Sequence, residues 1–235
     1  LTFDDETNDR TLDFNSDITI GSVGSFSATT TGSITVAGSW INSGTFSPGT
    51  GTITFDSTSS GKTINNGSST FAAVTFNGSG GAWSFLTNKA SITRGLTMIA
   101  GTLDNATGSA NIQVGGNLQC SGTCGTINLT TNKFIYAPAA SPRTFGTNVA
   151  GTTGWTFNQL AFKNSSLTLS AITVTINGTA TGTITVAGQL TVGSASDLGN
   201  MIVDNKTTSR SWDVNGDVVI VGSTGILQAG NPTFF

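Results

Sequence analysis

A five-residue pattern, in which Ile is followed two positions later by Val and four positions later by Gly, recurs along this chain. Its clearest copies begin at Ile34, Ile112 and Ile184, and the two intervals between them are nearly equal. Self-similarity at spacings below the size of a domain is typical of repeat architectures, in which each unit packs only against its neighbours. We therefore expect a repeat protein, with segments at about 34–111, 112–183 and 184–235.

A longer correspondence links the two ends of the sequence. When residues 1–20 are placed over residues 201–220 without a gap, seven of twenty positions are identical, and most others keep their apolar or polar character. The pattern therefore restarts after 200 residues. We predict that residues 1–235 form one continuous unit, of the kind expected from a window on a tandem array or fibre.

Within the repeats, apolar and polar residues alternate with a period of two, which is the pattern of a β-strand. This alternation places apolar side chains on one face and hydroxyls on the other in residues 52–55, 167–169 and 173–176. No stretch shows the 3.6-residue period of a helix, and Gly interrupts any run long enough to form one. The chain is predicted to be all-β.

The spacing of these strands indicates how they are arranged. Apolar strand centres near positions 18, 34, 53, 74, 92 and 112 give an average step of about 19 residues, which fits one coil of a right-handed parallel β-solenoid, or β-helix. The 69 Ser and Thr residues suit outward strand positions, and the 31 Gly residues suit corners. The alternative is a pair of tandem antiparallel β-sandwiches, with hairpin turns at Asn77-Gly78 and Asn177-Gly178.

Composition excludes several classes of function. The chain contains no His, so it has no imidazole base, no Ser-His or Cys-His nucleophile pair and no His metal ligand. Nine basic residues in 235 give no cationic surface for nucleic acid, and no apolar run is long enough to insert into a membrane. We expect no enzymatic activity and no cofactor. The remaining route to an enzyme would be a carbohydrate-cleaving solenoid, which needs carboxylates that converge in one groove; Asp56, Asp104 and Asp197 are isolated in the sequence.

Cys120 and Cys124 are the only cysteines. In an oxidising compartment they would close a small loop at a solenoid corner, and we favour this disulfide. The alternative is two separate thiols in apolar positions. Two thiolates without a further Cys or His fall short of a metal site.

Two segments match the opening of a calcium-binding loop. Residues 13–17 and 213–217 both read Asp-x-Asn-x-Asp, which brings three oxygen ligands together. Both segments lack the Gly at the sixth position and the Glu at the twelfth. We therefore interpret them as turns between two strands and predict no metal site.

Seven Asn-x-Ser/Thr sequons occur, about as many as chance gives. They matter only where the source organism glycosylates such sites, and they would then mark exposed turns. The seven asparagines are Asn66, Asn77, Asn105, Asn128, Asn164, Asn177 and Asn205.

Two residue types raise the question of a binding surface. A flat face with regularly spaced Thr side chains would order water, and Thr-x-Thr triplets occur at 52–54, 173–175 and 183–185. Exposed Trp rings would stack on sugars. The triplets do not recur on every coil, however, and Trp40 and Trp212 align with Leu positions of other copies. These two Trp residues are expected in the core, whereas Trp83 and Trp155 are left open.

Residues 34–46 and 51–56 resemble the repeats of very long bacterial surface and secreted proteins, including filamentous-haemagglutinin-like and autotransporter-like β-solenoids. The resemblance implies an extracellular or cell-surface location. We expect a structural segment of an extracellular fibre or long surface adhesin, which provides length, stiffness and end-to-end association with copies of itself. The alternative function is a surface-binding module for glycans or ice.

Overall fold

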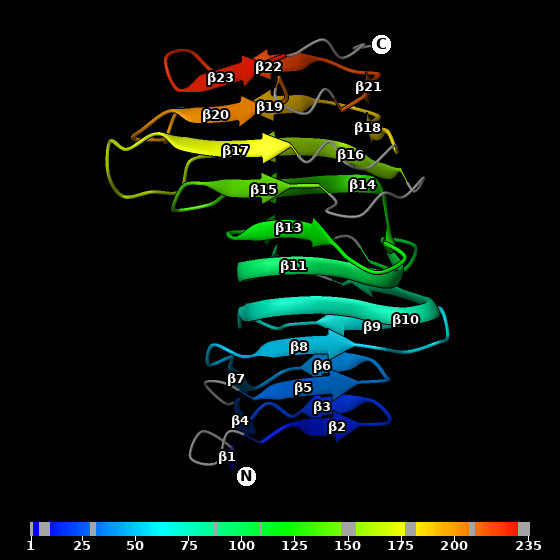
Figure 1. Ribbon diagram of the computed structural model, residues 1–235. Coiled ribbons are helices and arrows are strands. Elements are labelled where there is room, and N and C mark those ends of the chain that lie inside the picture. Colours follow the sequence, from blue (N-terminus) through cyan, green and yellow to red (C-terminus); the bar gives the residue numbers. More distant parts are fainter. Residues whose placement is uncertain are drawn as a thin grey trace.

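The computed structural model of this chain consists of β-strands stacked along one axis (Figure 1). It describes residues 2–4, 10–28, 32–86, 89–108, 110–146, 154–176, 182–206 and 210–229. Within these ranges all regular secondary structure is β-strand, and every strand pair is parallel. The all-β parallel solenoid, of about nine turns, is confirmed. The antiparallel sandwich alternative is excluded, because hairpins would pair their strands antiparallel.

Each coil of the solenoid passes through three parallel ladders, which we name A, B and C. Ladder A runs through the start of β10 (Phe71–Phe85) and the middle of β11 (Lys89–Asp104). Its other strands are β2 (Leu12–Phe14), β5 (Ser33–Val36), β8 (Thr52–Phe55), β13 (Asn117–Cys120), β15 (Arg143–Phe145), β17 (Ile172–Ile176), β20 (Met201–Asp204) and β23 (Gly225–Gln228).

Ladder B follows ladder A in every coil. It takes in the ends of β10 and β11 and the starts of β14 (Thr126–Tyr136) and β16 (Trp155–Phe162). Its remaining strands are β3 (Ile18–Ile20), β6 (Trp40–Asn42), β9 (Lys62–Asn65), β18 (Ile184–Val186) and β21 (Trp212–Val214).

Ladder C completes the coil and has two parts. A separate three-stranded sheet at the N-terminal end is followed by strands that use the start of β11 and the ends of β14 and β16. The separate sheet contains β1 (Thr2–Asp4), β4 (Ser25–Ser27) and β7 (Thr45–Ser47), and the later part adds β12 (Asn111–Val114), β19 (Leu190–Val192) and β22 (Val218–Ile220).

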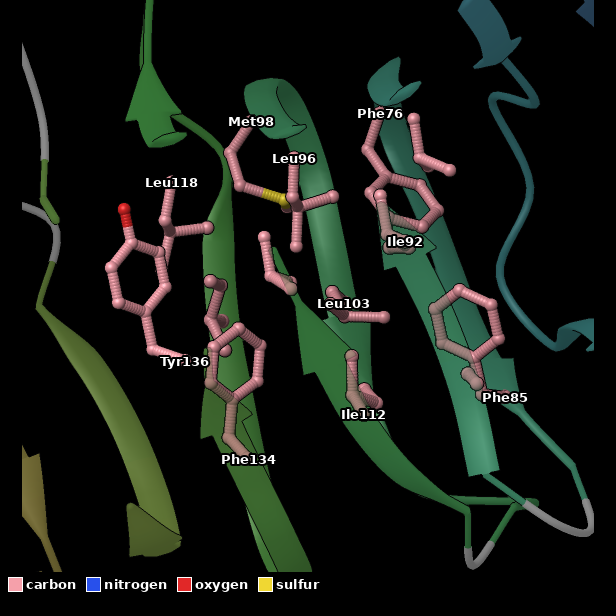
Figure 2. Packing of buried hydrophobic residues seen from close by; sticks show 14 of the residues in the cluster. Phe76, Phe85, Ile92, Leu96, Met98, Leu103, Ile112, Leu118, Phe134 and Tyr136 are labelled. Carbon is pink, nitrogen blue, oxygen red and sulfur yellow. The ribbon is translucent and has the colours of Figure 1, made fainter. Parts of the chain in front are cut away.

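The core is a continuous column inside the three ladders. Parallel pairing in register places like residues above one another, as in the series Ile34, Ile53, Val74, Leu96 and Leu118 along ladder A. Figure 2 shows this packing, in which side chains from successive coils point into the same interior. Because neighbouring strands lie only about 4.8 Å apart, each buried side chain contacts those of the coils above and below.

Aromatic rings fill much of this column. Phe55 and Phe76 are stacked at 5.5 Å between ring centroids, and Trp40 meets Phe46 edge-on at 4.8 Å. All four Trp residues are at most 1% exposed. The core position predicted for Trp40 and Trp212 is confirmed, and the two Trp residues left open are buried as well.

Most coils are longer than the sequence spacing predicted, and their lengths vary along the stack. Ile34 pairs with Ile53 and Phe145 pairs with Ile176, so the coil that starts at Phe145 is much the longer of the two. The expected step was short because the apolar centres used to calculate it lie on different ladders. From Ile18 on ladder B to Ile112 on ladder C, the chain completes four and one-third coils instead of five.

The recurring Ile-Val-Gly pattern marks corners, and its copies lie at different corners of the coil. Gly38 joins ladder A to ladder B, Gly116 joins C to A, and Gly188 joins B to C. In the same way, β2 lies on ladder A whereas its sequence counterpart β21 lies on ladder B. The sequence repeats therefore do not coincide with whole coils.

One predicted strand is wrong. Residues 167–169 alternate apolar and polar side chains as a strand does, but they form an exposed bend in the loop before β17. No helix in the part of the chain that the structure describes has the length and apolar character to cross a membrane.

Candidate functional site

The most elaborate surface feature is a group of three loops, here named the shelf, that leads from ladder C back to ladder A. It comprises residues 137–142, 163–171 and 193–200, which lie in successive coils. In the two coils that precede the shelf, the same connection takes only two residues, 93–94 and 115–116. The loop before β17 projects from the stack (Figure 1). Loops on a rigid scaffold are where binding functions concentrate.

Hydrogen bonds tie the loops of the shelf to one another. The buried Asn164 donates through Nδ2 to the carbonyl of Ser170 in its own loop and to that of Asn200 in the next, at 2.9 and 3.0 Å. The Asn164 backbone N–H donates to Oδ2 of Asp197 at 3.0 Å. Ser165 Oγ donates to the Ala137 carbonyl of the preceding coil. The loops are therefore held in one arrangement.

A groove runs along the inner side of the shelf. Two adjoining cavities, of about 410 and 200 Å³, share Gln113, Ala137 and Ser165 as lining residues. Together they extend from Ser91 in one coil to Leu198 four coils later. At about 4.8 Å per coil, the groove is roughly 19 Å long.

The groove has one positive and one negative side chain. Lys163 and Asp197 both line it, and all other lining residues, each within the described ranges, are uncharged. Burial raises the pKa of Asp197, while the hydrogen bond from Asn164 and the charge of Lys163 oppose the increase. The groove thus offers donors and acceptors without a strong net charge.

Two leucines on the shelf are exposed to solvent. Leu167 is 92% exposed and lines the groove, whereas Leu169 is 84% exposed and is not a lining residue. Isolated exposed leucines are common, but these stand on a loop fixed by hydrogen bonds, beside a groove. The sequence suggested a strand at this point, so neither the shelf nor its leucines were predicted.

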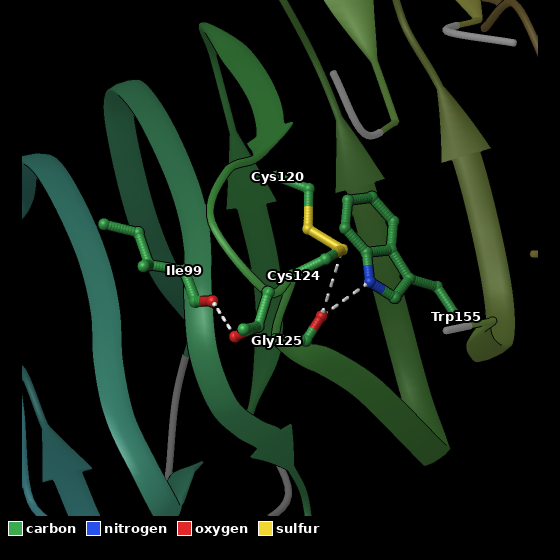
Figure 3. The surroundings of a disulfide bond; sticks show 6 residues. Ile99, Cys120, Cys124, Gly125 and Trp155 are labelled. Atoms are coloured by element: carbon green, nitrogen blue, oxygen red, sulfur yellow. Dashed lines mark hydrogen bonds between the residues drawn. A yellow bond between two sulfur atoms is a disulfide. The ribbon is translucent and has the colours of Figure 1, made fainter. Parts of the chain in front are cut away.

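A disulfide joins Cys120 and Cys124, with 5.1 Å between their Cα atoms. Figure 3 shows that it closes the corner between ladders A and B beside the indole of Trp155, whose Nε1 donates to the Gly125 carbonyl at 3.0 Å. Both cysteines are buried. Cys124 lies in the turn of this corner, with φ of 61°.

The two calcium-like segments form corners without a collected set of ligands. The carboxylate of Asp17 accepts the backbone N–H of Ser39 in the next coil at 2.7 Å. Asp213 accepts Nδ2 of Asn215 within its own segment. No group of three or more metal-ligating Asp, Glu or Cys side chains occurs among the described residues.

The sequons fall into two groups. Asn66, Asn164 and Asn205 are buried, and the Nδ2 of each donates to a backbone carbonyl. Asn105 is half-buried and also hydrogen-bonded, whereas Asn77 and Asn128 are exposed. Asn177 lies outside the described residues.

The other candidate surfaces do not form regular sites. On ladder A, Thr35, Thr54, Thr75 and Thr97 stack in one column, but the column beside it reads Ser33, Thr52, Ala73 and Gly95. A ranked pair of Thr therefore occupies only one of these four coils.

Asp104 accepts a hydrogen bond from Ser84 on ladder B, and Asp56 belongs to a third coil, so neither lines the groove with Asp197.

Both ends of the described stack expose apolar surface. Val218 and Ile220 are 48% and 47% exposed although they pair with the buried Leu190 and Val192 below them. At the other end, a cavity of about 380 Å³ opens among β2, β3 and β4, with Phe14, Ile18 and Phe26 in its lining. Among the described residues, no strand pairs on the outer side of β2, β3 or β22, whereas β4 is covered by β1.

Comparisons with known proteins give no relative. No protein-family model, no curated protein and no solved structure matches this chain.

Proposed function

We propose that this chain is a structural segment of an extracellular fibre or long surface adhesin, and that it provides length, stiffness and end-to-end association. The observation that carries the proposal is the uninterrupted apolar column inside about nine parallel coils. A load along the axis is opposed by the backbone hydrogen bonds between coils and by the packed core. Such a rod needs no reactive side chain.

Two further features support this role. A disulfide persists in oxidising compartments, which agrees with an extracellular location and with the resemblance to bacterial surface repeats. Only 9% of the residues are charged, so neighbouring rods repel one another weakly.

The apolar surfaces at the two ends of the described stack support end-to-end association. Strand edges with unpaired backbone groups accept further strands, and here the edges carry inward apolar side chains as well. Val218 and Ile220 would cover the cavity near Phe14 and Ile18 of a second copy, and the apolar column would continue from one chain into the next. Such a head-to-tail contact does not close on itself, and it generates a filament.

The association is tested by adding charge at one end. Replacing both Val218 and Ile220 by Lys should abolish concentration-dependent growth in analytical ultracentrifugation, because burying an unpaired ammonium group costs several kcal/mol. The matched control replaces Leu167 and Leu169 by Lys, which adds the same charge on the side of the rod. Equal association of both variants would overturn end-to-end stacking.

A further inference from the structure

We propose that the groove beside the shelf binds a neutral oligosaccharide. The site is separate from the ends of the rod, so it does not depend on the association proposed above.

The size and shape of the groove favour a short polymer. Volumes of about 410 and 200 Å³ lie at the scale of small-molecule sites, and the two cavities are joined through shared walls. A compact ligand would occupy one cavity only. An extended chain of several sugar units would follow the roughly 19 Å that the five coils span.

The polar lining matches hydroxyl groups. Gln113 offers an amide, and Lys163 and Asp197 add one strong donor and one strong acceptor. Ser166 and Ser196 offer hydroxyls, and Ser165, whose proton goes to the Ala137 carbonyl, offers an acceptor oxygen. A sugar hydroxyl both donates and accepts, so it can pair with any member of this mixed set. Because the two charges are opposite, the groove gives no net attraction to a polyanion.

The apolar part of the lining matches the other face of a sugar ring. Leu167 and Leu198 stand at the groove with exposed side chains, and they can cover the C–H groups of a ring whose hydroxyls point to the polar lining. The Trp side chains cannot stack on this ligand, because all four are buried in the core. Leu contacts replace aromatic stacking here.

The arrangement is preorganised for binding. Hydrogen bonds of Asn164 connect its own loop to the loop that carries Asp197, so the walls of the groove are set before a ligand arrives. A rigid site loses less conformational entropy when it binds. Asp197 is the only carboxylate in the lining, whereas glycoside cleavage commonly uses two, so we infer binding without hydrolysis.

The proposal is tested with defined oligosaccharides by isothermal titration calorimetry and saturation-transfer NMR. The probes are cellotetraose, maltotetraose and N-acetylchitotetraose, with tetragalacturonic acid as the anionic comparator. At least one neutral probe should bind with a saturable Kd below about 1 mM, and more tightly than the anionic one. Absence of neutral binding at 10 times that concentration, or preference for the anion, would overturn the proposal.

Variants locate the site. Leu167→Ala should raise Kd about five-fold and Gln113→Ala about ten-fold, through lost apolar contact and a lost hydrogen bond. The matched controls are Leu169→Ala, an exposed leucine of the same loop outside the groove, and Gln119→Ala, a half-buried glutamine on ladder A. Both controls should bind as the parent chain does. Binding that all four variants leave unchanged would place the ligand elsewhere and contradict the assignment.

Discussion

Asp56 has a carboxylate oxygen, Oδ1, that is buried without a hydrogen-bond partner. Burial raises the pKa of Asp56, and the negative charge of Asp13 raises it further. A carboxyl whose pKa is higher in the folded chain than in the unfolded chain favours folding when it is protonated. This contribution is present below the ordinary aspartate pKa of 3.8 and is lost as the pH rises through the folded-state pKa.

Asp56→Asn should therefore stabilise the chain at pH 7 and leave its stability unchanged at pH 3, because the amide removes a charge that is poorly solvated. Thermal unfolding at both pH values measures the difference. Asp217→Asn is the control, since Asp217 is also an aspartate but its side chain is exposed. A variant that is less stable than the parent chain at pH 7 would show that the Asp56 carboxylate has a favourable partner.

Single residues were predictable where apolar alignment determined them. Trp40 and Trp212 were assigned to the core because other copies have Leu at the aligned positions, and both are buried. Asn164 could not be assigned in this way. Its burial depends on carbonyl groups of Ser170 and Asn200, and the second of these belongs to another coil, far along the sequence.

At the scale of elements, the three Gly-containing corners share one cause. A Cβ on Gly38 would collide with the backbone of Asp17, one on Gly116 with the carbonyl of Arg94, and one on Gly188 with the carbonyl of Asn158. In each case the collision is with the backbone of the preceding coil. Corners of successive coils approach so closely that only glycine fits, which explains why this pattern recurs at every type of corner.

Gly116→Ala should consequently lower the free energy of unfolding by about 2 to 3 kcal/mol, because the backbone must shift to relieve the overlap with Arg94. Chemical denaturation provides the measurement. Gly21→Ala is the matched control: a Cβ there has no atom within 4 Å, and the change should stay within about 0.5 kcal/mol. Equal stability of the two variants would contradict the close packing of corners.

Strands and corners could be predicted from the sequence, but coil length could not. The period-two pattern is local, whereas the ladder to which a strand belongs depends on how far the chain travels between strands. The Ile-Val-Gly corner can join any two ladders, so counting its copies does not count coils. The shelf was missed for the same reason: the alternation at Leu167 and Leu169 has the pattern of a strand, while its position in a long connection between ladders makes it a loop.

At the scale of the whole molecule, the three ladders form one rod, and we propose different roles for its side and its ends. The side carries the shelf and its groove, while the ends expose the apolar column. About nine coils at about 4.8 Å each give an axial length of roughly 43 Å. If copies stack end to end, this length becomes the subunit spacing of the filament.

Electron microscopy of the concentrated chain tests the central claim most directly. The account predicts filaments with an axial subunit spacing of about 43 Å and a strong layer line at about 4.8 Å from the stacked strands, since the strands run perpendicular to the axis. Discrete rods that stay unassociated at millimolar concentration would contradict end-to-end association, and filaments without the strand spacing along their axis would contradict stacking through the ladders.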